Sequence, residues 1–96
     1  MVIEFLTFDV DPAERDTWLE VEQRTWSRFL EQCHGFVRKQ IWMEQGNPGQ
    51  VHVMVEWVDQ QSWSAITPEQ VHAVDATMGQ WFRPPTMRAY DVIRDD

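Results

Sequence analysis

The residue best suited to do chemistry is Glu22, which has Trp18 four residues before it and Trp26 four residues after it. Helical residues four apart share a face, so this spacing predicts a carboxylate in an apolar stripe facing the sheet or a cavity. Burying it costs free energy unless it gains a cationic partner or a raised pKa. A carboxylate with a raised pKa can act as a general base, for example toward an aromatic hydroxyl. The alternative is a structural carboxylate, bonded to a strand residue or water, or lying at a rim.

His72 is a second candidate catalytic residue, because Asp75 follows it by three residues in a predicted helix. The carboxylate could orient the imidazole for proton transfer; the alternative is a solvated surface histidine. His52 alternates onto a mixed strand face, and we interpret it first as a dimer contact. Cys33 and His34 are adjacent and point about 100° apart on a helix. No His-xxx-His or Cys-xx-Cys spacing occurs, so we expect no metal site.

Tryptophan and the last strand supply candidate ligand-binding residues. Five tryptophans should project between the helices and the sheet: Trp18, Trp26, Trp57, Trp63 and Trp81. They form either a packed core or a pocket in which Trp26 and Trp63 pack a planar or hydrophobic ligand. Arg88 and Tyr90 share a strand face and could bind a ligand's polar end or pair with Glu22. No Gly-rich phosphate loop, dinucleotide fingerprint or Gly-x-Ser-x-Gly elbow occurs, and we expect no cofactor.

Two similar stretches mark the helices that must position these residues: Asp11-Pro12-Ala13-Glu14 and Thr67-Pro68-Glu69-Gln70. Each has a side-chain acceptor, then proline, then Glu or Gln three residues after the acceptor, which is a capping box with proline at the first helical position. They predict helices over 12–33, with Gly35 as its stop, and over 68 to 81 or 82. A short helical turn should begin at Asp59.

Alternating apolar residues predict strands over 2–9, 36–44, 50–58 and 86–94, and a turn at 46–49 joins the middle two into a hairpin. The order βαββαβ predicts one α+β domain over residues 1–96. Its fold should be ferredoxin-like, a four-stranded antiparallel sheet with two helices on one face. The third strand should pack under the helices through four side chains: Val51, Val53, Val55 and Trp57.

The opposite sheet face should mix polar and large apolar side chains: Glu4, Leu6, Phe8, Phe36, Arg38, Gln40, Trp42, His52, Met54 and Glu56. Such a mixture is typical of a subunit interface. We therefore predict a homodimer in which two sheets meet face to face. The alternative is a monomer with a few surface aromatics.

Composition narrows the class of protein. The net charge is −8, from 16 acidic and 8 basic residues, so we expect no binding to nucleic acid or to anionic membranes. One cysteine permits no intrachain disulfide. The first residues lack the basic region of a signal peptide, and no apolar run reaches the roughly 18 residues of a membrane span. We expect a cytoplasmic protein.

Several short motifs carry a resemblance over essentially the whole chain. They are the opening Met1-Val2-Ile3-Glu4-Phe5-Leu6, Glu22 with Trp26, Val55-Glu56-Trp57, Gln60-Gln61-Ser62-Trp63 and Trp63-Ser64-Ala65-Ile66. With the element order and length, they resemble the dimeric α+β barrel superfamily and, within it, antibiotic-biosynthesis-monooxygenase-like domains of a small bacterial branch whose activity is not established. The resemblance implies a cavity between sheet and helices, used by some members for cofactor-free oxygenation of aromatic polyketides.

Other members of that superfamily degrade haem, and the resemblance implies where their residues would fall. They use Asn on strand 1, Trp before helix 2 and His on helix 2, which correspond here to Thr7, Ile66 and Ala76. None matches, and His72 is one turn early, which argues against haem degradation. Thr7 remains a candidate ligand-binding residue by its position.

Two functions of different kinds follow. One is a cofactor-independent monooxygenase-like enzyme acting on a small aromatic or hydrophobic molecule, with Glu22 as base, His72 or Tyr90 polarising the substrate, and Trp26 and Trp63 packing it. The other is a non-catalytic dimeric module that binds a hydrophobic ligand or a protein partner. A fold shared by many chemistries does not decide between them.

Overall fold

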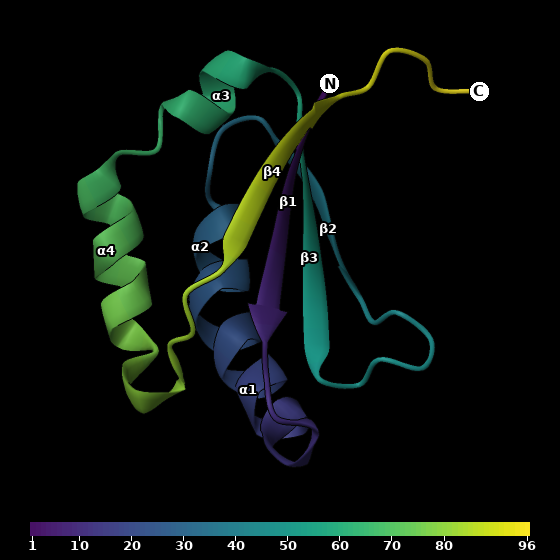
Figure 1. Cartoon of the computed structure of the whole chain (residues 1–96). Coiled ribbons are helices and arrows are strands. Elements are labelled where there is room, and N and C mark those ends of the chain that lie inside the picture. The colour runs from purple at the N-terminus through teal and green to yellow at the C-terminus, as the bar shows by residue number, and fades with distance from the viewer.

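The chain folds into a four-stranded sheet covered by helices on one side, and Figure 1 shows the arrangement in a computed structural model that describes all 96 residues. In chain order the elements are β1 (Val2–Asp9), η1 (Pro12–Glu14), α1 (Arg15–Glu22), η2 (Gln23–Ser27), α2 (Arg28–Glu31), β2 (Phe36–Trp42), β3 (Gln50–Trp57), α3 (Gln60–Ser64), α4 (Pro68–Thr77), η3 (Gly79–Trp81) and β4 (Thr86–Asp91). The predicted order of elements is confirmed; β1 ends at Asp9 as expected, while the other strands and the two long helices end earlier than expected.

The sheet is antiparallel with the spatial order β2-β3-β1-β4, so β3 and β1 are its central strands. All helices lie on one face, and the opposite face carries none (Figure 1). This is the expected ferredoxin-like α+β fold. As expected, β3 packs under the helices, and Trp57 and Trp18 are fully buried there.

The register of β1 corrects one expectation. Leu6 pairs with Val53 and Phe8 with Val51, so these side chains lie on the helix-facing side of the sheet. Glu4 lies in the same row of β1 and also faces the helices. Both faces of β1 carry large apolar groups, and alternation alone could not say which is buried.

A bulge in β2 corrects a second expectation, the placement of Phe36 on the outer face of the sheet. Phe36 pairs with Trp57 and Arg38 with Glu56, which leaves Val37 as an extra residue between them. The extra residue turns Phe36 toward the helices, where its ring meets Trp57 at a centroid distance of 6.1 Å. Its alternation with Arg38 suggested that Phe36 lies on the outer face, but the ring faces the helices.

The two helix starts differ in detail. Thr67 and Gln70 form the full capping box of α4, with Thr67 accepting from the Gln70 N–H and the Gln70 side chain accepting from the Thr67 N–H. Asp11 caps only the Ala13 N–H, at 2.9 Å, and opens a single 3₁₀ turn. Glu14 does not reach back to close that box; its carboxylate lies 3.5 Å from Arg83.

The long first helix is interrupted by the π-helical turn η2. Trp18, Glu22, Trp26 and Leu30 are spaced by four, and in a continuous α-helix such a row drifts by about 40° per step. A π turn holds more residues per turn, so the row stays on the sheet-facing side. The π turn thus positions both Glu22 and Trp26 over the sheet. No helix in the structure is long and apolar enough to span a membrane.

Candidate ligand cavity

A cavity of about 520 Å³ lies between the sheet and the helices, as the resemblance implied. Its walls come from β1, β3, β4, α1, η2, α2, α3, α4 and the segment leading into β4. Most of the lining is apolar, including Leu6, Phe8, Trp26, Val53, Trp63 and Met78. The predicted positions of Trp26 and Trp63 in a pocket are therefore observed, while Trp18 and Trp57 belong to the packed core.

Glu22 lies in the wall of this cavity and is only 3% exposed. It gains a cationic partner, as its burial required, but the partner is Lys39 of β2 and not Arg88. The Lys39 ammonium donates to Glu22 Oε2 and, at 2.8 Å, to Ser27 Oγ. Burial lowers the pKa of Lys39, while Glu22 opposes that shift. Glu22 Oε1 is buried and has no hydrogen-bond partner in the protein.

Glu4 is a second carboxylate in the cavity wall that sequence reasoning placed on the wrong face. Its Oε1 accepts a hydrogen bond from Trp57 Nε1 at 3.1 Å. Burial raises the pKa of Glu4, and the Trp57 hydrogen bond and the charge of Lys39 only partly oppose that effect. A signal was present in the sequence, because Glu4 interrupts the apolar row formed by Val2, Leu6 and Phe8.

Asp75 of α4 is the third carboxylate of the wall. Its Oδ1 accepts from Trp26 Nε1 at 2.9 Å, which ties α4 to η2 across the cavity. Burial raises the pKa of Asp75, against the opposing effects of Trp26 and His72. His72 itself is exposed and does not line the cavity, so its placement corresponds to the surface alternative.

The remaining predicted ligand-binding residues lie on the outer face of the sheet, away from the cavity. Thr7 pairs with Thr86 and hydrogen-bonds His52 Nδ1 at 2.9 Å. Arg88 and Tyr90 pair with Phe5 and Ile3 on that same face. Because these strand partners face away from the helices, neither Arg88 nor Tyr90 can pair with Glu22.

Lys39 is the functional residue that sequence reasoning missed most clearly. It is the only lysine of the chain, and it shares a strand face with Ile41, an apolar residue. A lone cation on an apolar strand face signals a buried partner. No group of three or more His, Cys, Asp or Glu side chains in the structure is placed to hold a metal ion.

Comparison with known proteins shows the fold. SnoaB, a cofactor-independent oxygenase from Streptomyces nogalater, is 19% identical, with a TM-score of 0.72 over 98% of this chain and 94% of that one. A monooxygenase from the gene ActVA-Orf6 of Streptomyces coelicolor, solved in complex with nanaomycin D, is 14% identical, with a TM-score of 0.78 over 99% and 89%. A conserved protein from Methanosarcina mazei is 15% identical, with a TM-score of 0.70 over 94% and 91%.

These likenesses show the fold alone, which a structure described as an antibiotic biosynthesis monooxygenase also shares. No protein-family model and no curated protein matches the sequence. At these identities the shared property is the architecture, and the chemistry has to be argued from the cavity itself.

Proposed function

We propose that this chain is a cofactor-independent oxygenase that acts on a small hydroxylated aromatic molecule held in the cavity, with Glu22 as the proton acceptor. The observation that carries the proposal is Glu22 Oε1, a buried carboxylate oxygen in the cavity wall without a partner. Such an atom is costly to leave unsatisfied, and a ligand hydroxyl would satisfy it.

The surrounding residues support this role. Lys39 occupies Oε2 of Glu22 and leaves Oε1 to accept a proton from the ligand. Trp26 and Trp63 supply flat apolar surfaces for an aromatic ring. Removing the hydroxyl proton makes the ring electron-rich, and the anion can then reduce O2.

The electrons in this reaction come from the substrate alone. With 1-naphthol as an example, 1-naphthol and O2 give 1,4-naphthoquinone and water. One oxygen atom forms the new carbonyl, and the other leaves as water with two hydrogens from the ring and the hydroxyl. The fold shared with SnoaB, a cofactor-independent oxygenase, supports a reaction of this class.

The alternative function is a binding module without turnover. It is favoured by the same ion pair, because the contact with Lys39 gives Glu22 a structural role that needs no turnover. Both functions use the cavity for the same kind of ligand. They differ only in whether bound ligand reacts with oxygen.

The enzyme proposal is tested by oxygen consumption with a panel of naphthols and hydroxyanthracenes, comparing the wild type with Glu22→Gln. Loss of a general base lowers turnover by about 10²–10⁴-fold, while quenching of tryptophan fluorescence should show that ligand still binds. Glu20→Gln, an exposed change on the same helix, is the matched control. Undiminished turnover in Glu22→Gln would remove Glu22 from the mechanism, and binding without oxygen consumption across the panel would favour the binding module.

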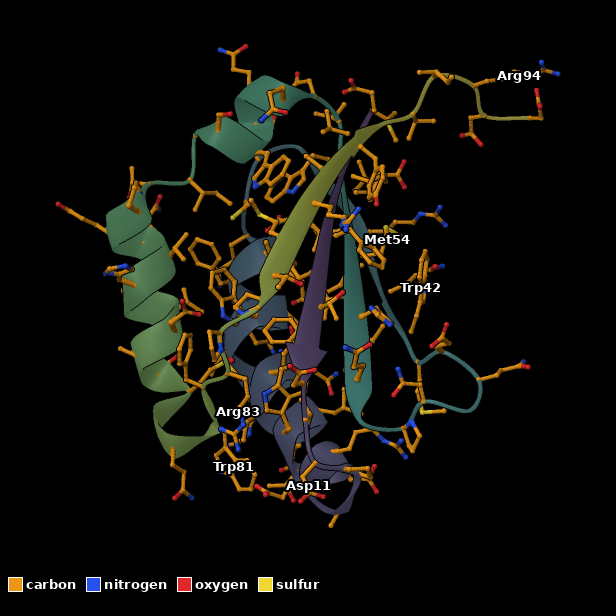
Figure 2. The ribbon with its side chains drawn as sticks, viewed as in Figure 1. Asp11, Trp42, Met54, Trp81, Arg83 and Arg94 are labelled. Atoms are coloured by element: carbon orange, nitrogen blue, oxygen red, sulfur yellow. The ribbon has the colours of Figure 1, made fainter.

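The assembly we propose is a homodimer through the outer face of the sheet. Phe5 lies at the centre of an aromatic cluster there, with ring centroids 5.7 Å from Trp42, 5.5 Å from His52 and 6.2 Å from Tyr90. Trp42 and Tyr90 are 45% and 49% exposed. Figure 2 shows Trp42 on the side of the sheet away from the helices. An exposed aromatic cluster with a polar surround is the composition of a subunit interface.

A further inference from the structure

We propose that Glu4 and Glu22 have opposite roles in the cavity: Glu4 carries a proton and donates a hydrogen bond to an acceptor oxygen of the ligand, while Glu22, whose Oε2 contacts Lys39, accepts one through Oε1. Glu4 would then be a specificity-determining residue, and the cavity would exclude ligands that carry a carboxylate. This inference rests on the proposed function in taking the same cavity as the ligand site.

The sheet register places the two carboxylates around one cation. Glu4 pairs with Val55, and Val55 pairs with Lys39, so Glu4 and Lys39 lie in one row across β1, β3 and β2 on the helix-facing side. Lys39 donates to Glu22 and Ser27, and it makes no hydrogen bond to Glu4. The only direct cation contact in this cluster therefore belongs to Glu22.

Glu4 is left with a single neutral donor, the Trp57 indole N–H on Oε1. A charged carboxylate in an apolar wall with one neutral hydrogen bond is poorly stabilised, and a proton removes that cost. The effect of burial on the pKa of Glu4 has the same direction. The acid proton then needs an acceptor, and Glu4 faces the cavity, where a ligand oxygen can supply one.

The charged groups around the cavity are carboxylates or cations that already have partners, and Arg83 is the cation among the lining residues. Glu22 of α1 and Asp75 of α4 contribute carboxylates to the wall. Lys39 of β2 is already paired with Glu22. Arg83, before β4, donates to the backbone oxygens of Gln80 and Phe82 and lies 3.5 Å from Glu14. Figure 2 shows Arg83 beside Trp81, below β4. A ligand carboxylate would be buried close to the carboxylates of Glu22 and Asp75, and this like-charge contact disfavours its binding.

Three naphthalene probes of similar size separate these roles, with binding measured by quenching of tryptophan fluorescence. 2-Acetonaphthone carries an acceptor oxygen only, 2-naphthol can donate to Glu22, and 2-naphthoate is an anion. We expect the two neutral probes to bind, and 2-naphthoate to bind at least about tenfold more weakly. Equal affinity for 2-naphthoate would overturn the inference.

The pH dependence of probe binding tests whether Glu4 is the hydrogen-bond donor. As the pH rises through the pKa of Glu4, the donor is lost and 2-acetonaphthone binding should weaken, while 2-naphthol binding should change less. Glu4→Gln keeps a neutral N–H donor and should bind 2-acetonaphthone without that pH dependence. Glu4→Leu should lose about three- to tenfold in 2-acetonaphthone affinity, the usual worth of one hydrogen bond, and keep 2-naphthol. An unchanged pH profile in Glu4→Gln would overturn the role of Glu4.

The outcomes are distinguishable from those of the proposed function. Oxygen consumption can be absent while the probes still discriminate as expected, which leaves the inference standing and removes the oxygenase. Conversely, turnover of naphthols with no discrimination against 2-naphthoate leaves the oxygenase standing and removes the role of Glu4. Circular dichroism spectra that match the wild type show that each variant is folded before binding is measured.

Discussion

At the scale of single residues, the Glu22–Lys39 pair determines what the cavity can do. Lys39 has a side chain only 8% exposed, and that of Glu22 is 4% exposed, so both charges lie out of water. A buried ion pair often gives little net stability, but removing one partner leaves the other charge unpaired. The pair therefore represents a constraint on the fold as well as a chemical feature of the site.

Lys39→Met should lower the free energy of unfolding by about 3–5 kcal/mol, because Glu22 would remain buried without its cation. The double variant Lys39→Met with Glu22→Leu removes both charges and should recover most of that loss. Urea denaturation measures the free energy of unfolding of the single and the double variant. A small effect of the single variant, comparable to that of the double, would show that Glu22 finds water or another partner.

At the scale of elements, Gly35 is the most restrictive junction. It lies at φ +83° in the turn between the end of α2 at Glu31 and the start of β2, and its carbonyl accepts from the Val58 N–H at 2.8 Å. A Cβ at Gly35 would lie 2.2 Å from Ser62 Oγ, so α3 is packed directly against this turn. The turn from the first helix into β2 thus requires glycine at position 35 for two reasons, its backbone conformation and the absence of a side chain.

Gly35→Ala should destabilise the protein more than Gly46→Ala, and thermal or urea unfolding measures the difference. Both glycines have φ +83°, so the backbone strain of about 1–2 kcal/mol is common to both changes. Only Gly35 has a neighbour where the methyl group would go, since nothing lies within 4 Å at Gly46. The clash should add about 1–3 kcal/mol. Equal losses would mean that α3 moves aside at little cost.

Some features of these elements could be predicted from the sequence, and others could not. Local chemistry predicted the helix starts at Pro12 and Pro68, the glycine turn before β2 and the hairpin turn, because each depends on neighbouring residues only, although the helix itself ends at Glu31 and not at Cys33. The burial of Glu22 followed from its place between Trp18 and Trp26. The inward face of β1 and the bulge at Val37 could not be predicted from the sequence, since both depend on pairing with β3. Those pairings move Glu4 into the cavity and keep Thr7, Arg88 and Tyr90 out of it.

At the scale of the whole molecule, the two faces of the sheet have different surroundings. One face is covered by helices and contains the cavity, and the other presents the cluster of Phe5, Trp42, His52 and Tyr90 without any covering element (Figure 1). Arg38 and Glu56 add an ion pair at 2.6 Å on the same face. Covering this apolar area with a second copy would remove it from water.

Light scattering should give a mass of twice 11.5 kDa for the wild type. Trp42→Glu and Tyr90→Glu place charges in the proposed interface and should shift the mass toward the monomer. Ile93→Glu, at a 95% exposed position in the C-terminal tail, is the control and should leave the mass unchanged. A wild type of 11.5 kDa at micromolar concentration would contradict the dimer.

The π turn η2 also limits which changes in length the first helix can accept. The π turn already holds one residue more than an α turn, so deleting one residue within 23–27 should give a regular α-helix and leave the facing of α1 and α2 nearly unchanged. Inserting one residue instead would rotate α1 by about 100° relative to α2. Val21 and Leu30 are both buried in the present structure, and after such an insertion they could not both face the sheet. The first helix is therefore expected to tolerate the loss of one residue in this turn better than the gain of one, and an insertion would separate Glu22 from Lys39 without altering either side chain.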